Sequence, residues 1–170
     1  VLGPFYVEGA PDMPDGGDIR RRRLDRAETC LVTGRVTDEK GKAVAGATVD
    51  VWQTAANALY DVQDPDAPQW NLRGRFKTNE TGAYAVVTEK PVSYSIPTDG
   101  PVGKMLDAAG RHAFRPAHIH FIVAAEGYQP LTTHVFVNGD DYLDSDAVFA
   151  TKASLVGQFE PCDDGALAKQ

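Results

Sequence analysis

Apolar and polar residues alternate in short runs along this chain, which predicts a structure built mostly from β-strands. In the run 47–52, for example, Ala47, Val49 and Val51 fall on one face because successive side chains of a strand point to opposite sides. The runs that we interpret as strands are 31–36, 47–52, 75–78, 83–88, 117–124 and 131–137. Several short strands separated by turn signals are typical of an antiparallel β-sandwich, so we predict an all-β fold.

Turn signals also suggest how the first four strands pair. The turn Asp38–Gly41 separates the first two runs, and the turn Asn79–Gly82 separates the next two. Two consecutive strands joined by such a turn commonly form a β-hairpin. We therefore predict that the first run pairs with the second and that the third pairs with the fourth.

Three segments lack this alternation. Residues 1–30 are rich in Gly, Pro, Asp and Arg and are expected to form an extended arm. Residues 54–74 and 90–116 predict long irregular loops, which in compact domains are usually either functional or disordered. A short helix is expected around Lys104–Ala109, ending at Gly110. The predicted organisation is an N-terminal arm at 1–30, a β-sandwich domain at 31–160 and a tail at 161–170.

Composition narrows the class of protein. The chain of 170 residues has the length of one domain with a substantial core, and it contains no apolar run near the roughly 20 residues of a membrane helix. A net charge of -7 argues against a nucleic-acid partner. Cys30 and Cys162 lack a zinc-binding spacing. We interpret them as ordinary cysteines of a cytoplasmic protein, with a disulfide as the alternative.

The pair His118 and His120 is the most specific chemical feature. Residues i and i+2 of a strand share a face, so both imidazoles project together while Ile119 and Phe121 point the other way. Two imidazoles converging from a stiff strand make half of a metal site. The alternative interpretation is the exposed face of an edge strand that carries two polar rings.

Two tyrosines in the irregular segments could complete such a site. Tyr60 and Tyr94 are by default half-buried residues with hydrogen-bonded hydroxyls. A phenolate, however, is a hard anionic donor that suits a ferric ion. Two phenolates and two imidazoles would neutralise two charges of Fe(III), unlike the two-histidine, one-carboxylate set of ferrous oxygenases.

Eight short stretches carry a wider resemblance. They are Gly3–Tyr6, Gly46–Gln53, Leu59–Gln63, Asn71–Phe76, Tyr94–Gly103, Gly110–His112, Arg115–His120 and Tyr142–Phe149. Their shared order and spacing resemble the catalytic domain of the intradiol ring-cleavage dioxygenases, over at least residues 1–157. The resemblance implies a non-haem Fe(III) enzyme of aromatic catabolism. Such an enzyme uses O2 to open a small catechol-type diol between its hydroxylated carbons, giving a muconate-type diacid.

The resemblance also implies roles for individual residues. The four iron ligands that it implies are Tyr60, Tyr94, His118 and His120. Tyr94 would be the releasable ligand that takes a substrate proton, Arg115 would stabilise negative charge on the ring, and His134 would lie near the metal. The residues that resemble the lining of the ring pocket are Val1, Leu2, Pro4, Phe5, Ile96, Pro97, Arg115 and Val148.

Two features depart from the family pattern. Members that cleave catechol usually carry a helical N-terminal domain, which contributes to a homodimer interface and to the pocket. This chain opens at Val1 without Met, so we expect a fragment without that domain and a homodimer for the full-length protein. His134 stands where many catechol-type members have Gln, which is more similar to the chlorocatechol and hydroxyquinol branches. The choice among catechol, chlorinated or alkylated catechols and hydroxyquinol stays open.

Two rival interpretations remain. The stretch Gly34–Val51 resembles the opening of transthyretin-like and carboxypeptidase-regulatory β-sandwich modules, which often bind without catalysis. The discriminating observation is whether the two tyrosines and the histidine pair converge on one point. A hydrolytic zinc enzyme is disfavoured, because we expect no carboxylate or third histidine in register with the pair.

Overall fold

The computed structural model describes residues 2–162, so the predicted pocket residue Val1 and the tail residues 163–170 lie outside the described part. The strands are β1 (Thr29–Arg35), β2 (Thr48–Trp52), β3 (Arg73–Lys77), β4 (Ala83–Glu89), β5 (Tyr94–Ser95), β6 (Phe114–Arg115), β7 (His118–Ala124), β8 (Leu131–Val137) and β9 (Val156–Gly157). The helical segments are α1 (Pro101–Ala108) and a short 3-10 helix, η1 (Ala153–Leu155). No helix among residues 2–162 is long and apolar enough to cross a membrane.

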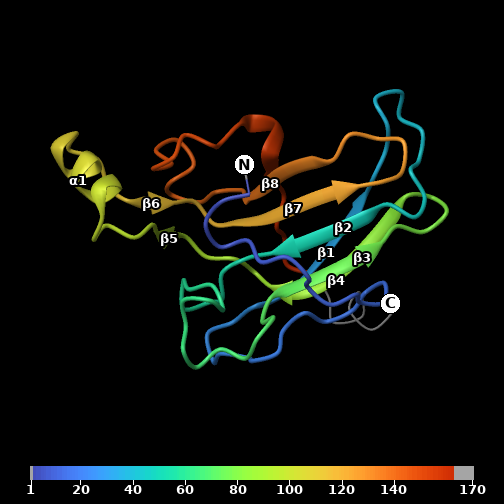
Figure 1. Ribbon diagram of the computed structural model, residues 1–170, viewed down its shortest axis with the longest axis horizontal. Helices are drawn as coiled ribbons and strands as arrows, with labels where there is room; N and C mark the ends of the chain where they lie inside the picture. Colours follow the sequence, from blue (N-terminus) through green and yellow to red (C-terminus); the bar gives the residue numbers. More distant parts are fainter. Residues whose placement is uncertain (1, 163–170) are drawn as a thin grey trace.

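Two sheets pack across one hydrophobic core (Figure 1). The larger sheet has the order β3-β2-β7-β8-β9, antiparallel except for the parallel pair β8 and β9. The smaller sheet pairs β1 with β4, and residues 16–19 of the N-terminal arm bond to the other edge of β4. The buried residues of this core are Ile19, Val49, Val51, Ala55, Leu72, Phe76, Val86, Ile119 and Phe121. The predicted all-β sandwich is confirmed.

The two predicted hairpins are wrong. β1 pairs with β4, and β2 pairs with β3 and β7, so the two strands of each predicted hairpin lie in different sheets. The turn Asn79–Gly82 therefore carries the chain across the edge of the sandwich instead of closing a ladder. The physical reason is that alternation specifies which face of each strand is buried but leaves its partner open. Here the two layers bury their apolar faces against each other, with Val49 of β2 and Val86 of β4 both fully buried in the same core.

The second long irregular segment forms an extension at one end of the sandwich (Figure 1). It contains the two-stranded ribbon of β5 and β6 and, between them, α1. The helix begins three residues earlier than expected because Pro101 occupies its first turn, where a missing N–H costs nothing. It ends as expected near Gly110, which adopts a left-handed conformation with φ +62°.

Strand β7 positions the histidine pair. It lies in the interior of the five-stranded sheet, so the edge-strand alternative is wrong. As predicted, Ile119 and Phe121 enter the core between the sheets, while His118 and His120 point to the other face. The N-terminal arm covers this face. Tyr6 of the arm packs against the ring of Trp52, and Trp52, a residue of β2, stacks on His120. Both cysteines, Cys30 and Cys162, are free among the described residues.

Candidate metal centre

Four side chains from three separate parts of the chain meet on the outer face of the larger sheet. We call Tyr60, Tyr94, His118 and His120 the donor cluster. Tyr60 belongs to the loop between β2 and β3, Tyr94 to β5, and both histidines to β7. All four are buried, with exposed fractions between 1% and 5%. The half-buried default for the two tyrosines is therefore wrong here.

The four donor atoms lie close together. Tyr60 Oη is 2.9 Å from His120 Nε2 and 3.4 Å from Tyr94 Oη, and the two histidine Nε2 atoms are 3.1 Å apart. Ligand atoms about 2.1 Å from a shared ion and at right angles to one another are separated by about 3 Å. The spacing of the cluster therefore fits a single bound ion.

Local structure accounts for each position. The register of the β5–β6 ribbon sets Tyr94 directly opposite Arg115. Tyr60 is presented by a tight turn in which the Ala55 N–H donates to the carbonyl of Leu59, 2.9 Å away. Aromatic rings fix the orientations of Tyr60 and His120. Phe5 stacks on Tyr60 with ring centroids 4.6 Å apart, and the Trp52 ring lies parallel to that of His120, also at 4.6 Å.

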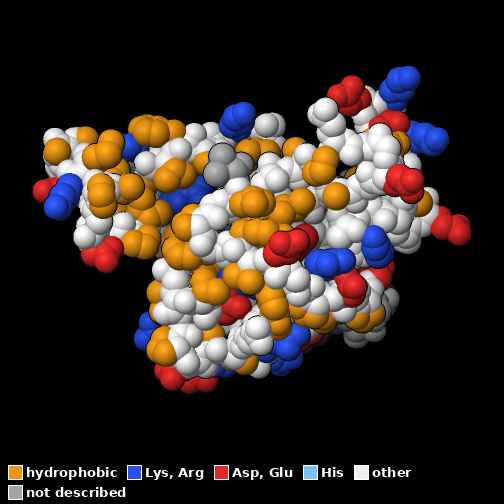
Figure 2. All heavy atoms as spheres, in the orientation of Figure 1, with side chains coloured by type: hydrophobic (Ala, Val, Ile, Leu, Met, Phe, Trp, Pro, Cys, Tyr) orange, Lys and Arg blue, Asp and Glu red, His pale blue; other side chains and the backbone are white. Residues whose placement is uncertain are grey.

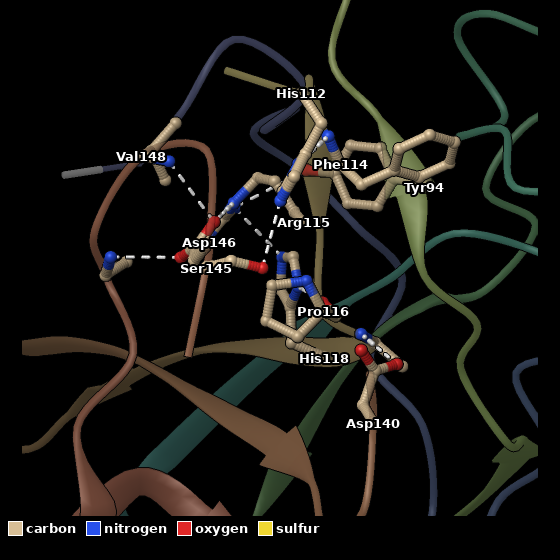
Figure 3. Close-up of polar contacts among 12 residues, drawn as sticks. Tyr94, His112, Phe114, Arg115, Pro116, His118, Asp140, Ser145, Asp146 and Val148 are labelled. Carbon is tan, nitrogen blue, oxygen red and sulfur yellow. Dashed lines mark hydrogen bonds and ion pairs between the residues drawn. The ribbon is translucent and has the colours of Figure 1, made fainter. Parts of the chain in front are cut away.

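Hydrogen bonding prepares His118 as a ligand. Its Nδ1 lies 2.7 Å from the carbonyl oxygen of Pro116, an acceptor, so Nδ1 carries the proton and donates it (Figure 3). The lone pair is then on Nε2, which points into the cluster. His120 Nδ1 is buried without a hydrogen-bond partner among residues 2–162, while its Nε2 also points inward.

Burial controls the protonation of the cluster. Burial, followed by the charge of Arg115, lowers the pKa of His118 well below its ordinary value. Burial and the neighbouring histidines do the same to the pKa of His120. Burial, with a further contribution from Tyr94, raises the pKa of Tyr60. Both imidazoles are therefore neutral near pH 7, the form that binds a metal, and the Tyr60 phenol loses its proton only to an incoming cation.

His134 joins the histidine pair from the adjacent strand. The β7–β8 register places it opposite His120, with ring centroids 4.5 Å apart. Ligand nitrogens of His118, His120 and His134 all lie within 4.8 Å of one another. The expectation that no third histidine lies in register was therefore wrong, because cross-strand neighbours cannot be read from sequence spacing. Structural zinc uses cysteine, histidine and carboxylate ligands, and the two phenols beside this group instead favour ferric iron.

Arg115 lies at the edge of the donor cluster. Its Nη1 is 3.1 Å from His118 Nε2 and 3.4 Å from Tyr94 Oη. The side chain is 7% exposed, and it forms an ion pair with Asp146 (Figure 3). A fixed positive charge thus borders the donors on the side of Tyr94 and His118.

The predicted pocket residues are only partly gathered at this cluster. Phe5 and Ile96 pack against the buried rings of Trp52, Tyr60 and Tyr94. Arg115, also in the predicted set, is buried beside the donors, whereas the remaining described members are exposed at the surface: Leu2, Pro4, Pro97 and Val148. Their role in binding a ring stays a prediction.

Sequence analysis missed three residues that shape the site. Trp52 stacks on His120, Asp146 pairs with Arg115, and Asp140 accepts hydrogen bonds from Ser93 and from the backbone of Ala117. Trp52 and Asp146 fall inside stretches that carried the family resemblance, which was the only available signal. No local pattern marks Asp140.

Comparison with known proteins supports the same family. A family model described as Dioxygenase matches residues 1–169. The chain is 50% identical to a hydroxyquinol 1,2-dioxygenase of Rhizobium sp. strain MTP-10005, over 100% of this chain and 57% of that protein. It is 48% identical to a 6-chlorohydroxyquinol 1,2-dioxygenase of Cupriavidus pinatubonensis, over 97% of this chain and 59% of that protein. The chain thus spans little more than half the length of these relatives.

A solved structure agrees with the observed fold. The crystal structure of a hydroxyquinol 1,2-dioxygenase from Pseudomonas putida DLL-E4 superimposes with a TM-score of 0.89 and 53% sequence identity. The match covers 94% of this chain and 55% of that one.

Proposed function

The chain belongs to the intradiol ring-cleavage dioxygenases, as their catalytic domain, and we propose that it opens a catechol-type diol with ferric iron held by the donor cluster. Both atoms of O2 would enter the substrate, and the product would be a cis,cis-muconate-type diacid. The observation that carries the proposal is the convergence of two phenols and two imidazoles in one buried cluster. A binding module without catalysis has no need of this arrangement.

The residues present fit Fe(III), because two hard phenol oxygens and two neutral imidazoles lie within reach of one ion. Tyr60, Tyr94, His118 and His120 would hold it. When bound, ferric iron supplies Lewis acidity toward the diol and the redox chemistry that makes the ring reactive toward O2.

The side chains themselves supply proton transfer and charge stabilisation. Tyr94 lies at the rim of the cluster beside Arg115, so its phenolate oxygen can accept the proton of a substrate hydroxyl. The permanently charged guanidinium of Arg115 can stabilise the negative charge that develops on the substrate. Tyr60 and His118 hold their positions throughout, since stacking on Phe5 and the bond to Pro116 fix them.

We propose hydroxyquinol, a benzene ring with three hydroxyls, as the preferred substrate. The relatives reported above at 48% to 53% identity are named for hydroxyquinol or its 6-chloro derivative. Catechol would be a poorer substrate. We also propose that the full-length protein is a homodimer.

The test is oxygen consumption by the iron-loaded protein with hydroxyquinol and with catechol, combined with product spectra and 18O2 labelling. We expect a red-brown protein with one iron per chain and both labelled atoms in the diacid. Tyr94→Phe should abolish or severely slow cleavage. Tyr128→Phe, a change at a tyrosine 46% exposed on the surface, is the matched control and should keep full activity. A colourless, iron-free protein or a fully active Tyr94→Phe variant would refute the proposal.

A further inference from the structure

We propose that Asp146 is a positioning residue that holds the Arg115 guanidinium against the donor cluster. The inference rests on the proposed function, because its catalytic readout requires ring cleavage.

The ion pair uses two of the three guanidinium nitrogens. Arg115 Nε donates to Asp146 Oδ1 at 3.1 Å and Nη2 donates to Oδ2 at 3.4 Å, a two-pronged contact (Figure 3). The side chains are only 7% and 2% exposed. The third nitrogen, Nη1, is left to contact Tyr94 and His118. The carboxylate therefore determines which edge of the guanidinium faces the donors.

The same carboxylate closes the turn that follows it. Its Oδ1 accepts a hydrogen bond from the Val148 N–H at 3.3 Å, and its Oδ2 accepts one from the Ala150 N–H at 2.9 Å. Between them Phe149 has φ +56°, a conformation that a residue with a side chain adopts only when its surroundings impose it. The exposed Phe149 ring lies 3.8 Å from the guanidinium carbon of Arg111. Figure 2 shows apolar side chains gathered over the end of the molecule that carries α1.

An amide cannot replace this carboxylate. Asp146 offers two anionic oxygens, and both are shared between Arg115 and the turn. Asparagine keeps one acceptor and turns an N–H2 group toward other donors. Because each oxygen serves both groups, the guanidinium and the turn then each lose one hydrogen bond, and the buried charge of Arg115 is left without a counter-charge. We expect Asp146→Asn to lower kcat/KM by between about 10-fold and 100-fold, as is typical when the partner of a functional side chain is removed.

The decisive test is a double-mutant cycle on kcat/KM with Asp146→Asn, Arg115→Lys and the double variant. If Asp146 acts through Arg115, adding Asp146→Asn to Arg115→Lys should change kcat/KM by less than about 3-fold. Asp18→Asn is the matched control, because Asp18 accepts the same two-pronged contact from Nε and Nη2 of Arg20, at 2.8 Å and 2.7 Å, and neither residue contacts the donor cluster. It should leave kcat/KM unchanged. Effects of the two single changes that simply multiply would overturn the proposal.

A second readout needs neither iron nor turnover. In the metal-free protein, the 15N–1H signal of Arg115 Nε, assigned by its loss in Arg115→Lys, should show a hydrogen-bonded, slowly exchanging proton. Asp146→Asn should abolish that protection, and Asp18→Asn should not. If Asp146→Asn does not fold, Asp146→Glu replaces it. A solvent-averaged Arg115 signal in the unaltered protein overturns the proposal by itself. A protected signal in a protein without ring cleavage refutes the proposed function but keeps the positioning role.

Discussion

The loop that carries Tyr60 is anchored to the sandwich by one buried ion pair, and breaking it should destabilise the protein strongly. Asp61 Oδ1 accepts hydrogen bonds from Arg73 Nε at 2.7 Å and Nη2 at 2.6 Å, with side chains 6% and 1% exposed. Asp61 Oδ2 also accepts the backbone N–H of Trp70 at 3.1 Å. Trp70 and Leu72 both adopt left-handed conformations, with φ +67° and +59°, so this part of the loop depends on such contacts.

The perturbation is Asp61→Leu, which leaves the Arg73 guanidinium buried without a counter-charge. Removing one partner of a buried ion pair costs about 3–5 kcal/mol, and the lost acceptor for Trp70 adds about 1 kcal/mol. For a chain of this length, a total of about 4–6 kcal/mol corresponds to a fall in Tm of about 8–24 °C. Urea unfolding and calorimetry of the metal-free protein measure both quantities.

A compensating double variant separates the lost charge balance from lost packing. Asp61→Leu combined with Arg73→Met removes both charges and should recover most of the stability. The surface pair of Asp12 and Arg75 is the control, because these side chains are 77% and 37% exposed and Asp12→Ala should cost less than about 1 kcal/mol. The reasoning fails if Asp61→Leu costs under about 1 kcal/mol, or if the double variant is no more stable than the single one.

Three further predictions follow from the site and the core. The pKa of His134 is lowered to about 4 by burial and by Arg115, whereas an unfolded histidine titrates near 6.5, so the unfolded chain binds more protons between these values. The metal-free protein should therefore lose stability as pH falls from about 7 to 4, and His134→Gln should flatten this dependence; a urea midpoint that rises toward pH 4 would contradict it. Asp140→Ala removes the acceptor for Ser93 and for the backbone of Ala117, which precede the donors Tyr94 and His118. It should weaken iron retention against a chelator about tenfold, and unchanged retention would count against this role of Asp140. Ile119→Ala, at a fully buried core position, should cost about 2–5 kcal/mol in urea unfolding, against under about 0.5 kcal/mol for Leu131→Ala, 57% exposed; equal costs would rule out the assigned core.

The local pattern of apolar and polar residues determined much of the secondary structure of this protein. Alternation located six of the strands and the buried face of the run 47–52, because the side-chain period of a strand is fixed by backbone geometry alone. The same period put His118 and His120 on one face and Ile119 in the core. Donor chemistry could then nominate two tyrosines, but their convergence with the histidines rested on family resemblance.

Only the tertiary structure decided which strands pair and which side chains meet. The sandwich set β1 against β4, placed His134 opposite His120, and brought Asp146 to Arg115 from 31 positions away. Such contacts join segments far apart in the chain, and the burial they achieve depends on the whole packed arrangement. Backbone periodicity carries no information about how much surface the whole arrangement buries. The packing of the layers therefore decides which strands pair, in which register, and which ion pairs form beside the donor cluster.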